Sequence, residues 1–379
     1  MMASRLYPIT RWLFGQVVEN LKVVGLKVIL SPLVFSLMAI YITGLILLDR
    51  RQNGTRISNW LPARAHDAIN RLLRIHKVST RAMMRAVIGW AKQLGKGYLI
   101  IDDVVVSKPF SKENRWVGWT YSTSEKRKVR GFHVVVLMWC CGEWRIPVAF
   151  RLWRPRQHCQ SKRYRTKLQL AWEMIVEVYQ TGLPIDYIVF DTFYTAGWIT
   201  KKINRLKLKW VGVLHPRTTI CYKNQHWSAA SLGKRLKLKW RACLQLRARS
   251  IIAYSPRYGT LRLVVTRNRH GNVEVIATND LGSNLTTIVM CKRSRWSIET
   301  LFRDTKQFSG LSACQCRVDQ ALVRHVAFVL IAFIIFQHLR LHPKETLGEV
   351  KDRIQLKLIT RGLPPPTPLR GKVSISKLC

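Results

Sequence analysis

The sequence predicts an α/β fold in which a mixed sheet is covered by helices. Short apolar runs rich in β-branched residues are typical of buried strands, and they occur at 98–106, 132–140, 144–153 and 187–191. Apolar residues at three- and four-residue spacing are typical of helices, and they occur at 168–182 and 195–206. The order of strand, hairpin, helix, strand and helix indicates a sheet packed against helices.

The flanking segments differ in their patterns. Residues 1–95 are predicted to form an N-terminal helical domain, because apolar residues recur at helical spacing with basic residues between them. Over 207–285, several strand-like runs are separated by turn residues, which predicts an all-β insertion. Helical spacing returns at 294–309 and 322–341, within the predicted segment 286–342, and residues 343–379 are predicted to form a basic tail that contains prolines.

The balance of charges points to a polyanionic partner. The chain contains 64 Lys and Arg against 20 Asp and Glu, a formal net charge of +44. Such an excess repels itself unless a polyanion neutralises it, and nucleic acid is the commonest polyanion. An apolar content of 48% excludes general disorder. The composition therefore favours a folded protein that binds nucleic acid.

Cysteine usage argues against zinc and disulfide bonds. Nine cysteines are scattered along the chain, and none forms a CxxC pair. Disulfide frameworks are typical of small secreted proteins rather than chains of this length. We therefore expect free thiols and a cytoplasmic location.

One apolar stretch has two interpretations. Residues 28–48 carry no charge and are long enough to span a bilayer. Pro32 interrupts the stretch, and basic residues flank both of its ends, so the orientation rule gives no clear direction. Two buried helices broken near Pro32 explain the same residues, and we expect these rather than a membrane span.

Acidic residues are scarce, yet some of them stand at the ends of apolar strands. Asp102 and Asp103 follow the run that begins at Tyr98, and Asp191 ends the run that begins at Tyr187. A carboxylate in such a place is costly unless it is paired with a cation. A salt bridge to an arginine and a bound metal ion would both meet this need.

A third acid lies on a predicted helix. Residues 295–310 have helical spacing, and Gly310 is a typical C-terminal stop. One face of this helix carries a carboxylate among cations, namely Arg295, Glu299, Arg303 and Lys306. An ordinary ladder of helical ion pairs would have the same pattern.

Together the acids suit phosphodiester cleavage. This reaction commonly uses two Mg²⁺ ions about 3.5–4 Å apart, which carboxylates bridge and flank. Mg²⁺ prefers hard oxygen ligands, so Asp and Glu are suitable and the cysteines are not. Neighbouring Arg and Lys side chains would hold the phosphates.

The acid-bearing segments resemble those of a known family. The 295–310 helix is similar to the third-acid helix of bacterial insertion-sequence transposases of the DDE superfamily, in the group with a Tyr-Arg-Glu-Lys signature. Arg295, Glu299 and Lys306 match the spacing of that signature. IIDDVVVSKP (100–109) resembles the family's first-aspartate strand, and VFDTFYTAGWI (189–199) resembles its second. The resemblance covers about residues 95–340.

This resemblance implies a fold and a set of site residues. The fold would be a ribonuclease-H-like core, formed by residues 96–206 and 286–342 and interrupted by the β-insertion. The catalytic residues, which would also bind two Mg²⁺ ions (or Mn²⁺ in their place), would be Asp103, Asp191 and Glu299. The DNA-binding residues would be Arg295, Lys306, Lys292 and Arg303.

Two departures from the family pattern affect these assignments. Lys292 stands where the signature has Tyr, which would alter a contact to terminal DNA. Val104 stands where Thr is usual after the first Asp. Strand alternation points only one of two adjacent acids inward. The family pattern selects Asp103, because a small hydroxyl residue normally follows the ligand, and Asp102 remains the alternative.

The sequence thus predicts a cytoplasmic, nucleoid-associated DNA transposase that cuts at element ends and joins them to target DNA. Its partners would be terminal repeats, target DNA and a second copy of the chain. Two other classes fit less well. One is a catalytically decayed DNA-binding descendant of such an enzyme, and the other is a membrane-anchored protein that uses residues 28–48.

Overall fold

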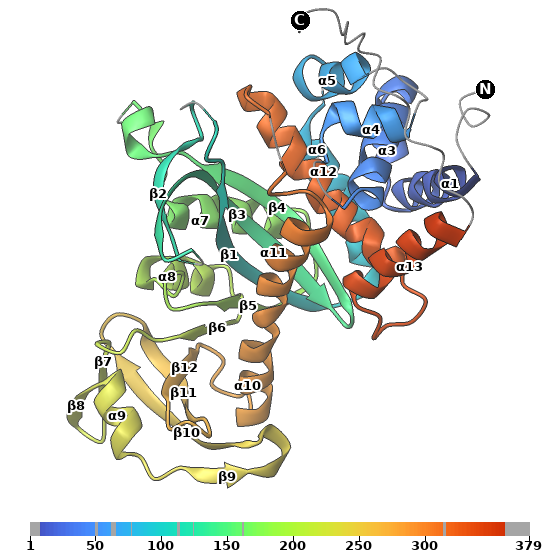
Figure 1. Ribbon diagram of the computed structural model, residues 1–379. Coiled ribbons are helices and arrows are strands. Elements are labelled where there is room, and N and C mark those ends of the chain that lie inside the picture. The colour runs from blue at the N-terminus through green and yellow to red at the C-terminus, as the bar shows by residue number, and fades with distance from the viewer. Residues whose placement is uncertain are drawn as a thin grey trace, which may run out of the picture.

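The computed structural model describes residues 8–49, 52–61, 66–76, 78–111, 114–123, 125–160, 163–313 and 316–360. The end of the predicted basic tail, from residue 361 onward, lies outside the described residues. Helices pack on a large mixed sheet (Figure 1), which confirms the predicted α/β class.

The N-terminal part is helical, as predicted. Its helices are α1 (Pro8–Val23), α2 (Leu26–Ile29), α3 (Pro32–Leu47), α4 (Gly54–Trp60), α5 (His66–Arg74) and α6 (Thr80–Ala91). In α6 one face is buried, including Met83, Val87 and Ile88, and this face packs against the sheet. The periodicity that predicts this helix therefore marks the face that it buries.

The apolar stretch 28–48 is divided between two helices. α2 ends at Ile29, and α3 begins at Pro32, where proline occupies the first helical turn. Nearly all of α3 is buried from Val34 onward, because it packs against α1, α5 and α12 (Asp319–His338). The break at Pro32 is therefore confirmed, but only α3 is a buried helix, because Val28 and Ile29 of the short α2 are 90% and 41% exposed.

α12 is also strongly apolar. Among the described residues, it alone is long and apolar enough to cross a membrane. However, 89% of its apolar window is buried inside the protein, which is typical of a core helix.

The sheet is built around β1. Its strands are β1 (Gly97–Ser107), β2 (Gly118–Ser122), β3 (Arg127–Cys141), β4 (Trp144–Trp153), β5 (Ile185–Phe190), β6 (Trp210–Val213), β7 (Thr219–Tyr222), β8 (Gln225–Ser228), β9 (Lys239–Arg241), β10 (Leu246–Ser255), β11 (Gly259–Arg267) and β12 (Val273–Thr278). The strand order is β2-β3-β1-β5-β6-β12-β11-β10-β7-β8, with β4 on β3 and β9 on β10. β1 runs antiparallel to β3 and parallel to β5.

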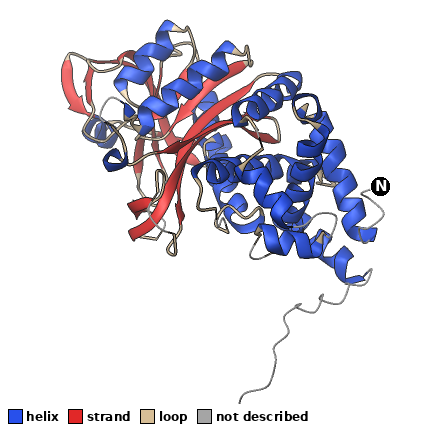
Figure 2. Ribbon diagram, turned by 90° about the horizontal axis from the view of Figure 1, so that it is seen from above, coloured by secondary structure: helices blue, strands red, loops and turns tan. Residues whose placement is uncertain are grey.

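Helices cover both faces of the central strands (Figures 1 and 2). α7 (Lys167–Gln180) packs on β3 and β4, and α8 (Gly197–Arg205) follows β5 on the same side. α11 (Trp296–Phe308) packs on β1 from the opposite side. The chain then continues through α12 into α13 (Leu347–Thr360). Adjacent residues of β1 therefore face different helices.

The segment predicted as an all-β insertion is mostly strands, but it also contains helix α9 (Ala229–Arg235). It forms the lower lobe of Figure 1. Its strands are not a separate sheet, because β6 pairs in parallel with β5 and antiparallel with β12. One hydrogen-bonded sheet therefore extends from the core into this lobe. α10 (Leu285–Ser294), which the sequence pattern did not predict, leads back to α11.

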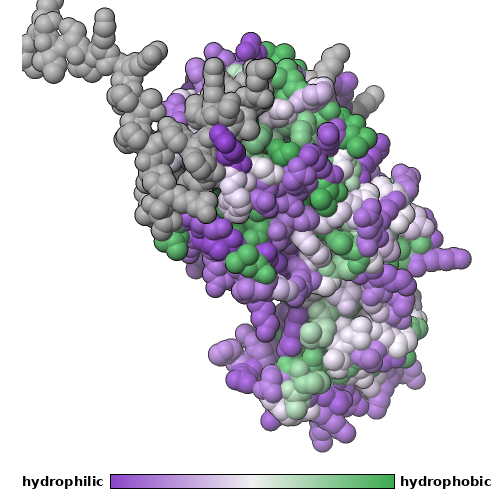
Figure 3. All heavy atoms as spheres, turned by 90° about the vertical axis from the view of Figure 1, so that its right-hand side faces the viewer, coloured by the Kyte–Doolittle hydropathy of each residue, from purple (hydrophilic) through white to green (hydrophobic). Residues whose placement is uncertain are grey.

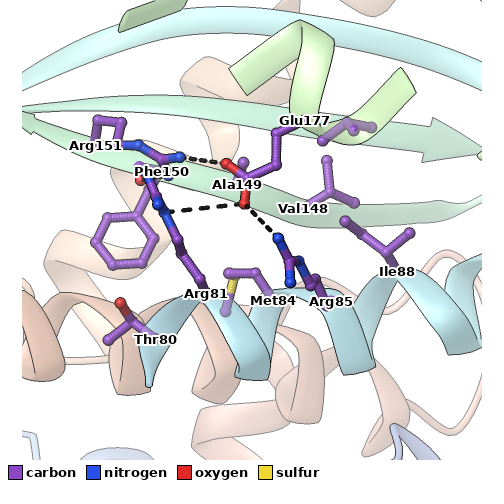
Figure 4. A pocket seen from close by; sticks show the side chains of 11 residues that line it. Thr80, Arg81, Met84, Arg85, Ile88, Val148, Ala149, Phe150, Arg151 and Glu177 are labelled. Carbon is purple, nitrogen blue, oxygen red and sulfur yellow. Dashed lines mark hydrogen bonds and ion pairs between the residues drawn. The ribbon is translucent and has the colours of Figure 1, made fainter. Parts of the chain in front are cut away.

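A cluster of arginines around one glutamate ties the helical domain to the sheet (Figure 4). Glu177 on α7 forms an ion pair with Arg151 on β4, and lies 4.0 Å from both Arg81 and Arg85 on α6. Arg151 and Glu177 are 18% and 22% exposed, so their pair is only partly screened by solvent, whereas the exposed Arg81 and Arg85 are strongly screened. This cluster offsets part of the repulsion within a very basic chain.

We expect Gly131→Ala to destabilise the fold, because a Cβ at Gly131 would lie 2.4 Å from the Val106 carbonyl oxygen. That oxygen belongs to β1, paired with β3, and it cannot move away without distorting the sheet. Overpacking of this kind costs about 1–3 kcal/mol. The measurement is thermal or urea unfolding, with Gly15→Ala in α1 as the control. An added methyl group there meets no atom within 4 Å, so the control should match or exceed the wild-type stability.

Candidate active site

An open cleft of about 540 Å³ lies between the middle of β1 and helix α11. Its lining residues include both adjacent aspartates of β1 and the glutamate of α11, namely Asp102, Asp103, Val104, Val105, Tyr121, Thr123, His133, Lys167, Glu299, Phe302, Arg303 and Lys306. Carboxylates and cations therefore share one cleft.

Asp102 points toward the α11 side of the sheet. One carboxylate oxygen accepts a hydrogen bond from the Asp103 N–H at 2.8 Å, and the other lies 3.3 Å from Nη1 of Arg295. Burial raises the pKa of Asp102 to about 7, and the nearby charge of Asp191 adds to this rise. Asp102 is therefore a partly buried carboxylate with too little compensating positive charge.

Asp191 is the first residue after β5. Its carboxylate accepts a hydrogen bond from the Tyr194 N–H at 2.8 Å, and its carbonyl accepts one from the Thr195 hydroxyl at 2.5 Å. Burial raises its pKa, and Asp103 contributes to the rise, while the bond from Tyr194 opposes it. Because β1 and β5 are parallel neighbours, Asp191 at the end of β5 lies close enough to Asp102 of β1 for their charges to interact.

Glu299 lies one helical turn after Arg295 on α11, and the two side chains form an ion pair. The same Arg295 also contacts Asp102 through its other terminal nitrogen. One guanidinium therefore links Asp102 and Glu299. Arg295 also acts on Asp191, since it opposes the rise in that pKa.

Asp103 points the other way, toward α7. Lys167 donates to one carboxylate oxygen at 2.6 Å, and Nδ1 of His133 lies 3.2 Å from the same atom. The Tyr194 hydroxyl donates to the second oxygen at 2.9 Å. Burial alone would raise the pKa of Asp103, but the bonds from His133 and Lys167 outweigh it, so that the pKa is lowered.

The predicted DNA-binding residues fall into two groups. Arg303 and Lys306 line the cleft, and burial lowers the pKa of Lys306. Arg303 also forms an ion pair with Asp304 at 3.0 Å. Lys292 lies on α10 instead, pairs with Glu274 at 2.5 Å, and is not among the residues that line the cleft. The structure therefore does not bring Lys292 together with the acids.

Lys167 and His133 are site residues that sequence reasoning did not single out. Lys167 opens α7 directly after Thr166, whose side chain forms a capping box with Gln169. His133 lies on β3, diagonal to Asp103 across the β1–β3 pairing. The capping motif at Thr166 could have predicted that Lys167 begins a helix. It could not have predicted that Lys167 contacts Asp103, because the two residues are far apart in the sequence.

The donor chemistry of the acids suits a divalent cation. In the described part of the chain, no three His, Cys, Asp or Glu side chains come together as a ready metal cluster. Burial and repulsion from Asp191 nevertheless raise the pKa of Asp102, and a bound cation would relieve this repulsion. Carboxylate oxygens are the ligands that Mg²⁺ prefers. The residues present therefore fit this group of ions.

Comparison with known proteins gives the family. The model of the family described as DDE superfamily endonuclease matches residues 35–245. The chain belongs to this family. No curated protein matches the sequence. The family match confirms the resemblance to DDE-superfamily transposases, and the matched residues include Asp102, Asp103 and Asp191. The Tyr-Arg-Glu-Lys group stays a prediction, because the match ends before α11.

The two adjacent aspartates of this DDE endonuclease should affect stability in opposite directions. The raised pKa of Asp102 means that the folded state binds its proton more tightly than the unfolded state does, so the wild type loses stability as pH rises from the ordinary pKa of an aspartate to about 7, and the loss is complete above that pH. Asp102→Asn should therefore raise the melting temperature at pH 8 in EDTA, and the gain should shrink below pH 7.

Asp103→Asn is the matched comparison. The lowered pKa of Asp103 means that its ionised form stabilises the fold above its usual pKa, and this contribution is lost as pH falls. Asp103→Asn should therefore lower the melting temperature at pH 8 and have less effect in acid. Melting curves of both variants from pH 4 to 8 test this. Equal effects of the two substitutions would contradict the separation of the two acids.

Proposed function

We propose that this DDE superfamily endonuclease is a DNA transposase, which cuts phosphodiester bonds at insertion-sequence ends and transfers the ends to target DNA. The observation that carries the proposal is the role of Arg295, which pairs with Asp102 and with Glu299 and opposes the rise in the pKa of Asp191. Asp102 and Glu299 line a cleft that also contains cations. The net charge of +44 supports a nucleic-acid substrate. On the side seen in Figure 3, hydrophilic residues are spread over the surface and are interspersed with hydrophobic ones.

We assign the first catalytic acid to Asp102 rather than Asp103. Both carboxylate oxygens of Asp103 already accept hydrogen bonds, from Lys167 and from Tyr194. Asp102 lies on the α11 side, where Arg295 joins it to Glu299, and among the described residues its second oxygen contacts only that guanidinium. Both aspartates are electrostatically coupled to Asp191, so the engaged oxygens of Asp103 decide the choice. Asp103 would instead hold the turn after β5, since Tyr194 also donates its N–H to Asp191. It would thus be a positioning residue for the second acid.

Divalent metal ions would be held by Asp102, Asp191 and Glu299. When bound, such ions supply the activation of a water or 3′-hydroxyl and stabilise the leaving oxygen. In the structure Arg295 neutralises two of these acids, so a cation would compete with it for them. Displaced from the acids, the Arg295 guanidinium would be available to a phosphate, a partner with which Arg forms bidentate hydrogen bonds.

The cations of α11 would hold the DNA backbone in the cleft. Lys306 is partly buried beside the acids, where burial strengthens its attraction for a phosphate. Arg303 lies one turn earlier on the same helix. Lys292 would contribute less to the reacting phosphate, because its ammonium is engaged by Glu274.

The wider assignments follow from this function. The helical residues 1–95 would recognise the terminal repeats, and the strand-rich insertion at 207–285 would bind DNA through phosphates. Two ends must be held together during transposition, which calls for a homodimer on DNA. The location would be cytoplasmic and associated with the nucleoid.

The first test is cleavage of a supercoiled plasmid that carries the DNA flanking this gene, with Mg²⁺ or Mn²⁺. We expect cuts at defined ends, with cleavage lost in Asp102→Asn, Asp191→Asn and Glu299→Gln and in EDTA. Asp103→Asn should retain cleavage at a rate reduced about 10- to 100-fold, which is typical when a supporting residue is removed.

Each variant must also be shown to bind DNA in a gel-shift assay. If Asp103→Asn abolishes cleavage while Asp102→Asn remains active, the first-acid assignment returns to Asp103. If the wild type binds DNA and does not cut it with either metal, the chain is a decayed, DNA-binding descendant, and Lys292→Tyr is the first reversion to test.

A second test concerns Lys306. Lys306→Ala should weaken cleavage at low substrate concentration more than at saturation, because the lost charge serves to hold phosphate. Arg163→Ala is a suitable control, since Arg163 is exposed and does not line the cleft. An unchanged KM with an unchanged kcat for Lys306→Ala would contradict a phosphate-holding role.

A further inference from the structure

Helix α5 presents one face to solvent. Asp67, Asn70, Arg71 and Arg74 fall at helical spacing and are all exposed, and with Ile75 they line a single shallow hollow of about 290 Å³. Figure 1 shows α5 at the outer end of the helical domain, away from the strand-rich lobe. A partner could therefore reach this face without a rearrangement of the fold.

The opposite face of α5 is firmly packed. Ile69 and Leu72 have no exposed surface, and Leu73 is 4% exposed. α4 packs against this helix, as do α3 and α12, and Arg324 of α12 donates to the Leu73 carbonyl at 2.9 Å. The outer side chains thus stand on a helix that is fixed on its inner side, as recognition by a rigid element requires.

Most polar side chains of the outer face have no partner among the described residues. Asp67 pairs with His66 at 3.1 Å. By contrast, the side chains of Asn70, Arg71 and Arg74 make no hydrogen bond or ion pair with any part of the chain that the structure describes. Two of these three side chains are cations, in a chain that already carries a large positive excess. We therefore expect these cations to contact an anionic partner molecule rather than acidic residues of the same chain.

The residue types on this face are those that read bases. Arg forms bidentate hydrogen bonds with guanine, Asn does so with adenine, and an apolar side chain such as Ile75 can contact the thymine methyl group. A two-helix unit such as α4 and α5 commonly places its second helix in the major groove of duplex DNA. We propose that α5 is the helix that reads DNA sequence, through Asn70, Arg71 and Arg74.

A neighbouring groove extends this surface. A cavity of about 420 Å³ is lined by Asn70 and Arg74 on α5 and by Arg317 on the segment before α12. That segment is held to the end of β1, since Lys108 donates to the Cys316 carbonyl at 2.5 Å. Arg317 is therefore placed to contact the phosphates of a duplex whose bases are read by α5. This inference rests on the proposed DNA function.

The test is selection of binding sites from a pool of randomised 20-bp duplexes by the full-length protein, in EDTA and at fixed salt. We expect a defined consensus. Asn70→Ala, Arg71→Ala and Arg74→Ala should each weaken binding to the selected duplex about 10- to 100-fold. Binding to a scrambled duplex should fall only as much as in Arg163→Ala, which removes one exposed charge elsewhere.

Conservative variants separate base reading from charge. Arg71→Lys and Arg74→Lys keep the charge but lose the bidentate geometry, so they should relax the consensus while leaving binding to the scrambled duplex unchanged. The buried side chains of α5 are untouched, and circular dichroism should show wild-type unfolding. A wild type that selects no consensus, or variants that select the wild-type consensus at wild-type affinity, would overturn the proposal.

The selection is independent of cleavage. If the wild type cuts no plasmid but the α5 variants relax its consensus, the reading helix stands and the transposase function fails. If the wild type cuts at defined ends and the α5 variants cut at the same ends equally well, the function stands and the assignment of α5 is wrong.

Discussion

Strand alternation along β1 is the constraint on which the site depends. Asp102 and Asp103 are adjacent, so one carboxylate faces α11 and the other faces α7. Only the parallel pairing of β1 with β5 brings Asp191 to the same region of the sheet. Burial and the charge of Asp191 raise the pKa of Asp102, whereas hydrogen bonds from His133 on β3 and Lys167 on α7 overcome burial and lower the pKa of Asp103, so the pKa values of neighbouring residues shift in opposite directions.

Arg295 holds the acidic face together in the structure. It pairs with Glu299 on its own helix and reaches across to Asp102 on β1. Without the Arg295 guanidinium, α11 would bring the negative charge of Glu299 toward Asp102 and Asp191, two partly buried carboxylates that already repel each other. The docking of α11 on the sheet and the neutrality of the cleft therefore depend on the same side chain.

The sequence predicted the features that depend on local pattern. Buried β-branched runs marked β1 and β5, and helical spacing marked α11 with its Arg295–Glu299 pair, because side-chain periodicity follows from burial on one face. The contacts of Lys167 and Arg295 with β1 could not be predicted, since they join residues far apart in the chain. Which of the two aspartates faces α11 depends on tertiary packing for the same reason. α9 was missed because its seven residues are too few to establish a period.

The continuity of the sheet has a mechanical consequence. β6 is hydrogen-bonded to β5, which ends at the residue before Asp191, and to β12 in the strand-rich lobe. That lobe cannot swing as a free body about a hinge, because the swing would break backbone hydrogen bonds between β6 and β12. A force applied to the lobe is instead transmitted through β6 to β5, the strand that directly precedes Asp191.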